Sequence, residues 1–237
     1  MNFVFQVLSG IFLVLGFSND SFFSFESIQF IMLEMSFGWF FRIVHMNFVS
    51  FFFVIIFLHI FKALFFNSFN LKEVWNIGIL IFLLLMMESF LGYVLIWSQM
   101  SFWACTVITS LLMVLPLFGL KLVFWVWSNF FVSLLTLKFF FVLHFILPLF
   151  LVVLIFFHLF FLHNYGSTSK IYFSGFIDKI SFFPCFWLKD LLNFIVFVFM
   201  IIFILFKPFL FNDSEMFLEM NHLMSPVHIV PEWYFLF

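Results

Sequence analysis

The sequence predicts an all-α integral membrane protein, a four-helix bundle with one further membrane span beside it. Of its 237 residues, 67% are hydrophobic and 8% are charged, whereas a soluble domain carries about 25% charged residues. The apolar runs are long and do not alternate with polar residues, which indicates helices rather than a β-barrel. Four histidines, spaced as two equal pairs, lie inside these runs. The net charge of −2 gives no basic surface for nucleic acid, so membrane lipid is the expected surrounding.

Five apolar stretches give the predicted spans, which lie at residues 1–17, 39–66, 74–97, 139–162 and 191–211. The first is shorter than the roughly 20 residues that cross a bilayer. We therefore expect the chain to enter its first helix part-way along. A polar loop at 18–38 follows this first stretch.

Residues 98–138 contain no clean additional span. Two helices are expected here, at 100–113 and 121–133, interrupted around Pro116 and Gly119. Their tryptophans favour a position along the membrane interface.

Consecutive spans alternate in direction, so the second and fourth are predicted to run parallel. The loops at 62–73 and 163–190 then share one side of the membrane, and the longer loop includes Lys170, Asp178 and Lys179. More basic residues lie on this side than on the other. By the positive-inside rule, it is predicted to face the matrix or cytoplasm.

The four histidines carry the functional prediction. His45 and His59 are fourteen residues apart, and so are His144 and His158. Fourteen residues are just short of four helical turns, which puts both rings of a pair on nearly one face, about 21 Å apart along the axis. Parallel helices that face each other would bring the two first histidines together at one depth and the two second histidines at another. Two imidazoles across a gap are the axial ligands that a haem iron accepts.

A simpler reading is four unrelated histidines, each satisfied by a neighbouring carbonyl. The repeated spacing in two membrane-length runs argues against it, because a histidine inside a membrane is costly and usually functional.

Short motifs occur in order along nearly the whole chain. They are Gly38-Trp39…Arg42…His45, Trp75-Asn76-Ile77-Gly78, Gly92-Tyr93-Val94, Gln99-Met100-Ser101-Phe102-Trp103, His144-Phe145-Ile146-Leu147-Pro148, His158-Leu159-Phe160-Phe161-Leu162-His163 and Pro231-Glu232-Trp233-Tyr234. Together they resemble the cytochrome b family, the membrane-embedded subunit of ubiquinol–cytochrome c reductase. The loop before the last motif is similar to that of worm mitochondrial members.

The resemblance implies two low-spin haem b groups, each with two histidine ligands. One would lie between His45 and His144, near the side opposite the 62–73 loop, which carries most of the acidic residues and is called the acidic side. The other would lie between His59 and His158 on the matrix side. It also implies that residues 1–211 form the haem-binding helical region and that 212–237 begin the quinol-site region. Arg42 and Lys62, each three residues from a ligand, would pair with haem propionates.

Glycines support the bundle independently. Gly78 and Gly92 in the third span are also fourteen residues apart, and a glycine lets a flat macrocycle approach the backbone closely. Ordinary small-residue helix packing is the alternative. Gly10 is the equivalent in the first span, and its partner would precede Met1. We therefore expect a partial chain, lacking its N-terminus and three later helices, and inactive by itself.

Two quinone sites are implied by the same resemblance. At the site on the acidic side, Glu232 would accept a proton as quinol is oxidised, and the pocket would be lined by Tyr93, Trp103, Pro231 and Tyr234. At the opposite site, His163 and Asp190 would hydrogen-bond and protonate the quinone, with Ser167 and Lys189 nearby. Without the resemblance, His163 and Asp190 read as ordinary polar loop residues.

Some residues depart from the family pattern. Ile96, Ser98, Ala104 and Cys105 leave the fine shape of the quinol pocket open. Glu88 is a carboxylate inside the third span to which the pattern gives no role, and it is either protonated or bonded within the bundle.

The expected function is electron transfer from ubiquinol through two haems to ubiquinone, contributing to a proton gradient in the mitochondrial inner membrane. The expected partners are a Rieske iron–sulfur subunit and cytochrome c1 in a dimeric complex. One alternative is a chloroplast- or bacterial-type relative, although the chloroplast type carries Pro-Glu-Trp-Tyr on a separate subunit. Another is a non-redox transporter or channel subunit, which predicts broken helices or repeats that the sequence does not show. A non-functional remnant stays open.

Overall fold

The computed structural model describes residues 1–168 and 180–236, and the chain is helical in these ranges, without a strand. Four helices are long and apolar enough to cross a membrane: α3 (Gly38–Phe65), α4 (Lys72–Val94), α7 (Leu134–Tyr165) and α8 (Cys185–Phe206). A shorter apolar helix, α1 (Asn2–Val14), packs along α3. The predicted all-α integral membrane fold is confirmed.

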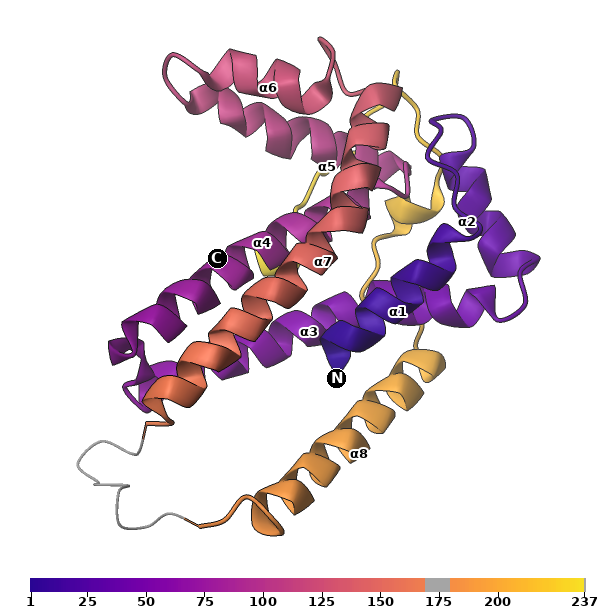
Figure 1. Ribbon diagram of the computed structural model, residues 1–237. Helices are drawn as coiled ribbons and strands as arrows, with labels where there is room; N and C mark the ends of the chain where they lie inside the picture. The colour runs from indigo at the N-terminus through magenta and orange to yellow at the C-terminus, as the bar shows by residue number, and fades with distance from the viewer. Residues whose placement is uncertain (169–179, 237) are drawn as a thin grey trace.

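The bundle is built from two helix pairs. Helices α4 and α7 lie side by side over much of their length, and α1 lies against α3 (Figure 1). Helices α3 and α7 run in the same direction, and the loops that follow them meet, with Ser68 Oγ and Thr168 Oγ1 2.5 Å apart. The parallel arrangement predicted for the second and fourth spans is therefore present. The charged positions predicted for the second of these loops, Lys170, Asp178 and Lys179, lie outside the described residues.

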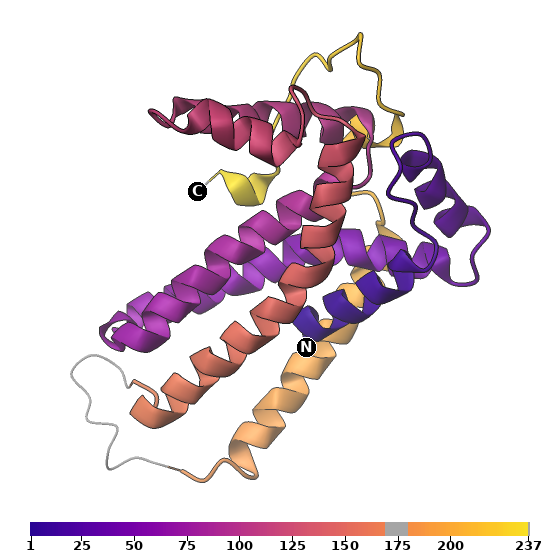
Figure 2. The same cartoon turned by 45° about the horizontal axis from the view of Figure 1, so that its top comes forward.

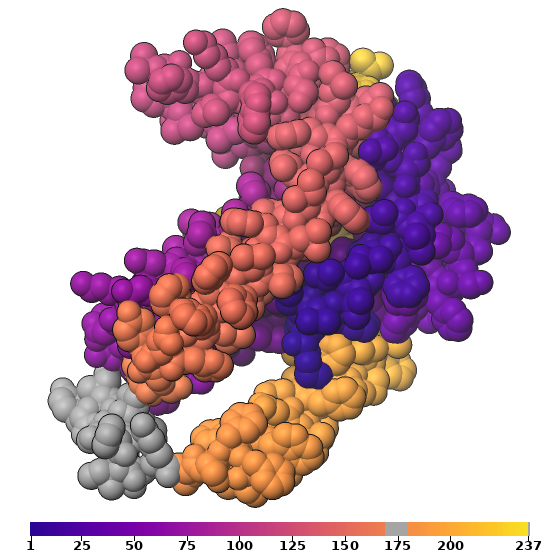
Figure 3. All heavy atoms as spheres, in the orientation of Figure 1, coloured from indigo at the N-terminus to yellow at the C-terminus, as the bar shows by residue number. Residues whose placement is uncertain are grey.

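Helix α8 stands beside the bundle rather than within it. Its main contact is with α3, where Ile204 is 1% exposed in a cluster that includes Val44 and Phe48. The space-filling view shows an opening between most of α8 and the bundle (Figure 3). Apolar side chains along the rest of α8 are exposed, as expected for a surface that faces lipid.

The loop predicted at 18–38 contains a helix, α2 (Ser24–Leu33), which corrects that expectation. Its buried positions are Ser24, Ser27 and Ile31, so one helical face is buried mainly through small polar residues. Ser24 Oγ donates a hydrogen bond of 2.6 Å to the Leu95 carbonyl. Because two serines make this face, the hydrophobic period that marks a helix is absent from the sequence.

The segment between α4 and α7 forms a helical hairpin at one end of the bundle (Figure 2). Its members are α5 (Gln99–Ser110) and α6 (Gly119–Trp127), joined through a 3-10 turn at Leu111–Val114. Trp127 Nε1 donates to Thr109 Oγ1 at 2.7 Å, which ties the two helices together. The predicted pair of short helices, interrupted around Pro116 and Gly119, is thus observed with somewhat different ends.

Two spans, α7 and α8, differ most from the sequence prediction. Helix α7 begins at Leu134 instead of 139, because the Ser133 backbone N–H donates a hydrogen bond of 3.0 Å to Thr136 Oγ1 at the helix start and Lys138 lies within the first turns. Helix α8 begins at Cys185 instead of 191 and ends at Phe206 instead of 211. Its end precedes Lys207-Pro208, where the proline cannot donate a helical hydrogen bond.

Candidate functional site

The four histidines meet as two pairs across the bundle. His45 of α3 faces His144 of α7 with ring centroids 6.4 Å apart and planes 87° from parallel. His59 and His158 form the second pair, at 6.3 Å and 66°. The pairing follows from the parallel course of α3 and α7 and from the equal spacing on each helix.

The separation of the rings suits a metal ion between them. Two metal–imidazole bonds of about 2.0 Å, together with the two ring radii, place the ring centres about 6 Å apart. Each ring centre of the observed pairs lies 6.3–6.4 Å from its partner. Both gaps therefore fit two axial ligands of one iron.

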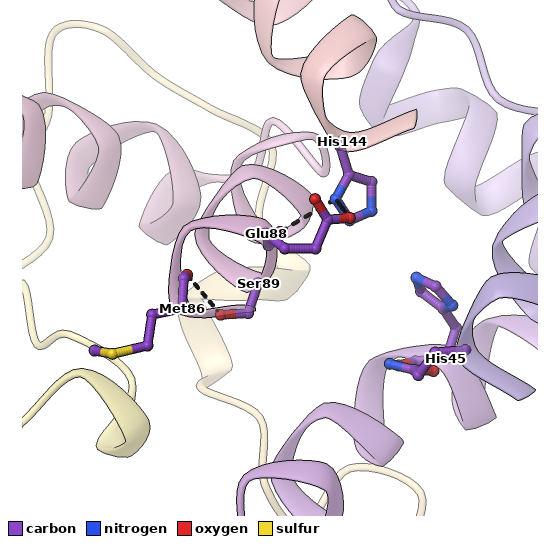
Figure 4. A network of polar contacts seen from close by, with 6 residues as sticks. His45, Met86, Glu88, Ser89 and His144 are labelled. Atoms are coloured by element: carbon purple, nitrogen blue, oxygen red, sulfur yellow. Dashed lines mark hydrogen bonds and ion pairs between the residues drawn. The ribbon is translucent and has the colours of Figure 1, made fainter. Parts of the chain in front are cut away.

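Hydrogen bonds orient the rings of the first pair. His45 Nδ1 lies 2.9 Å from Ser9 Oγ, and the Ser9 hydroxyl donates to the Gln6 carbonyl, so Ser9 Oγ is the acceptor for His45. His144 Nδ1 lies 2.6 Å from Glu88 Oε1 and 3.1 Å from the Glu88 carbonyl oxygen. When Nδ1–H donates in this way, Nε2 keeps its lone pair for a metal. Figure 4 shows the two rings and the contact of His144 with Glu88.

Glycines let three of the four rings rest against helix backbones. A Cβ added to Gly10 would lie 3.2 Å from His45 Cε1, and one added to Gly78 would lie 3.1 Å from His158 Cε1. At Gly92 the Cβ would lie only 2.6 Å from His144 Cε1. The glycines were expected to make room for a macrocycle, and in this structure they make room for the imidazoles that would ligate its iron.

The first pair opens into a cavity of about 520 Å³, within the usual range of about 300–1,000 Å³ for small-molecule sites. Predicted site residues that line it are Gly10, Arg42, His45, Gly92, Tyr93, His144, Glu232 and Tyr234. Glu88 lines it as well. The cavity thus joins the candidate haem gap to the candidate quinol pocket.

Glu232 is the carboxylate of this cavity that lies outside the membrane-spanning helices. Burial, with a smaller contribution from the charge of Asp213, raises the pKa of Glu232 to about 7. A carboxylate with such a pKa exchanges its proton near neutral pH, as a general base requires.

Two predicted pocket residues lie elsewhere. Trp103 packs against the core cluster around Trp97 and Phe102, and Pro231 is absent from the cavity wall. Pro231 is next to Glu232, which lines the cavity, and Trp103 is next to Phe102 of the core cluster. Neither Trp103 nor Pro231 reaches the cavity in this structure.

The predicted residues at the other end of the bundle are open to the surroundings. His59 and Lys62 are exposed, as are His163, Ser167, Lys189 and Asp190. Among the described residues, no hydrogen bond or ion pair joins His163 to Asp190. The structure therefore brings together the second histidine pair but not the second predicted quinone pocket.

Sequence reasoning missed Ser9 and left the role of Glu88 open. Ser9 is 1% exposed and contacts His45 from a different helix. A serine next to Gly10 carries no signal by itself, because its partner is 36 residues away. For Glu88 the sequence did carry a signal, because a carboxylate within a membrane span indicates a functional residue. Its partner, His144, could not be read from the sequence.

An apolar helical bundle with two imidazole pairs at two depths is typical of one class of protein, the membrane proteins that hold haem between their helices. The chain belongs to the Cytochrome b/b6/petB family, whose model matches residues 1–166. It is 53% identical to the cytochrome b of Caenorhabditis elegans and to that of Caenorhabditis briggsae, each over 234 residues. These matches cover 99% of this chain and 63% of each relative, so the chain spans less than two thirds of the length of these curated relatives.

A solved structure described as a hyperthermophilic respiratory Complex III contains a similar chain. The two superpose with a TM-score of 0.89 at 31% sequence identity, covering 98% of this chain and 64% of the other. Fold and family therefore agree.

Proposed function

We propose that the chain carries electrons within a ubiquinol–cytochrome c reductase, as the part of its cytochrome b subunit that holds two haem b groups. The observation that supports this most strongly is the pair of imidazole gaps, with ring centroids 6.4 and 6.3 Å apart, at two depths of one apolar bundle. Residues 1–211 would form the haem-binding region, and 212–237 would begin the quinol-site region.

His45 with His144 would hold one haem, and His59 with His158 the other. Each haem, when bound, would carry one electron at a time and, with both axial positions filled, would offer no open site for oxygen. Ser9 would fix the His45 ring by accepting from its Nδ1–H. Arg42, which lines the same cavity, would pair with a propionate, and Lys62 would do so at the other haem.

Quinol oxidation is proposed to take place in the cavity beside His45 and His144. Quinol loses two protons as it becomes quinone, and Glu232 would take one of them, which its pKa of about 7 favours. The rings of Tyr93 and Tyr234 would line the pocket. Trp103 and Pro231 would support this wall from outside the cavity.

Quinone reduction is proposed for the opposite end of the bundle. His163 and Asp190 would hydrogen-bond the quinone and supply protons, with Ser167 and Lys189 beside them. These side chains are exposed in the isolated chain, so the pocket would close only around its quinone, membrane lipid and the rest of the complex.

The complex would be dimeric, with a Rieske iron–sulfur subunit and cytochrome c1 as partners. It would span the mitochondrial inner membrane, because two curated relatives that are each 53% identical to this chain are nematode cytochrome b sequences. Proton uptake at one face and release at the other would contribute to the gradient used for ATP synthesis.

Haem content tests this proposal directly. The complete subunit, purified in its complex, should contain two haem b groups per chain, both low-spin and six-coordinate by optical and EPR spectroscopy. A single haem, or a high-spin signal from a five-coordinate iron, would contradict the proposal.

A further inference from the structure

Glu88 is a carboxylate within a membrane-spanning helix, and the proposed electron and proton path does not use it. Polar and charged groups in a span are costly, and they usually mark a functional site. The Glu88 side chain is 12% exposed and lines the cavity beside the first histidine pair. A residue so placed needs a partner that compensates for its burial.

That partner is His144. Its Nδ1 lies 2.6 Å from Glu88 Oε1, which is the one contact of salt-bridge length between a basic and an acidic side chain within residues 1–168 and 180–236. The other carboxylate oxygen, Oε2, is buried and has no hydrogen-bond partner in the same part of the chain. The Glu88 carboxyl group is therefore directed at one imidazole rather than shared among several donors.

The two rings of the first pair consequently differ in their partners, and Figure 4 shows the contact of His144 with Glu88. His45 Nδ1 has a neutral hydroxyl, that of Ser9, at 2.9 Å. His144 Nδ1 has a carboxylate. No carboxylate lies within ion-pair distance of His59 or His158 in the described part of the chain, so the two pairs differ from each other as well.

We propose that Glu88 is a positioning residue that acts through His144 to lower the reduction potential of the haem held by His45 and His144. This inference rests on the proposed function, because it requires a haem in that gap. A carboxylate that accepts the Nδ1–H of a ligand histidine makes the ligand more basic. Oxidised iron carries one more positive charge than reduced iron, so a nearby negative charge in a medium of low dielectric constant favours the oxidised form.

A purely structural role for Glu88 makes a different prediction. The backbone carbonyl of residue 88 lies 3.1 Å from His144 Nδ1 and already offers an acceptor that holds the ring. If Glu88 only fixed the ring, a neutral side chain of the same shape would leave the potential unchanged. Charge removal at constant shape therefore separates the two roles.

The test is a redox titration of the complete subunit in its complex, following each haem by its optical spectrum. Glu88→Gln should retain both haems and shift the reduction equilibrium of the His45–His144 haem at least tenfold toward the reduced form, about 59 mV. The His59–His158 haem should move much less. Glu34→Gln is the matched control, because Glu34 is exposed after the end of α2, and it should shift neither haem.

Glu88→Asp, which keeps the charge, should give a potential closer to that of the original protein than Glu88→Gln does. Equal potentials for the two variants, or a Glu88→Gln protein with both haems and no shift, would overturn the inference. If the glutamine variant does not assemble, Glu88→Ser gives the same readout, with a raised potential supporting the inference and an unchanged one overturning it. Absence of two bis-histidine haems from the original subunit would instead contradict the proposed function.

Discussion

The ring of Tyr234 stacks on that of Phe53, with centroids 4.6 Å apart and planes 3° from parallel. Beside it, the Trp233 indole N–H donates to Ser50 Oγ at 3.2 Å. Phe53 and Ser50 both lie on α3, between the two histidines of that helix. The C-terminal segment is thereby fastened to the wall of the cavity, and Glu232 is held where it lines the space beside His45.

Loss of the stacked ring should loosen this attachment. Tyr234→Leu removes an aromatic contact worth about 0.5–1.5 kcal/mol, so quinol oxidation should slow by about two- to tenfold while both haems remain. Tyr234→Phe keeps the ring and serves as the control, with a rate near the original. Steady-state quinol oxidation and haem spectra of the complete complex measure both, and an unchanged rate in the leucine variant would show that the stack does not position Glu232.

Glu232→Gln should slow quinol oxidation and leave both haems in place. Removing a general base commonly costs about 10²–10⁴-fold, and each tenfold loss corresponds to about 1.4 kcal/mol of barrier. Water or a neighbouring group at the cavity would reduce the loss. Glu219→Gln, which changes an exposed carboxylate of the preceding loop, should have no such effect.

The same residue predicts a pH dependence. Above pH 7 Glu232 is a carboxylate that can accept a proton, and below pH 7 it is already protonated, because burial raises its pKa to about 7. The rate of quinol oxidation should therefore fall as the pH drops through about 7, and Glu232→Gln should lose this inflection. A rate profile identical in the two proteins would make Glu232 structural.

Gly92 and Gly78 should each be needed for binding of the haem whose histidine packs against them. Gly92→Ala would place a Cβ 2.6 Å from His144 Cε1, and overpacking of this kind typically costs about 1–3 kcal/mol. We expect the His45–His144 haem to be weakened or lost, with the other intact. Gly78→Ala, next to His158, is the reciprocal variant. Haem-resolved redox titration measures both, and loss of the same haem in both variants would contradict this assignment.

The helical bundle could be predicted because hydrophobic runs and residue spacing are properties of the sequence itself. The equal intervals from His45 to His59 and from His144 to His158 became two facing pairs once α3 and α7 ran parallel. Helix α2 escaped prediction, because its buried face is made by Ser24 and Ser27 rather than by apolar side chains. The ends of α7 and α8 differ from the prediction because a hydrogen bond at the helix start or a proline, rather than the nearest charged residue, sets the boundary.

The site was predicted less completely than the fold. The contact between Ser9 and His45 joins residues 36 positions apart, and only the packing of α1 on α3 creates it. The partner of Glu88 depended in the same way on the rotation of α4 against α7. The roles of His163 and Asp190 stay predictions, because both side chains are exposed, neither lines the cavity beside His45 and His144, and no hydrogen bond joins them within the described residues.

The most direct test of the paired-histidine account is a redox titration of the complete subunit carrying His59→Leu. The leucine removes one imidazole of the His59–His158 pair, while His45 and His144, with their ring centroids 6.4 Å apart, are untouched. The account predicts that the haem of His59 and His158 is lost and that the other remains with its spectrum and potential largely unchanged. Loss of both haems, or of neither, would contradict the pairing.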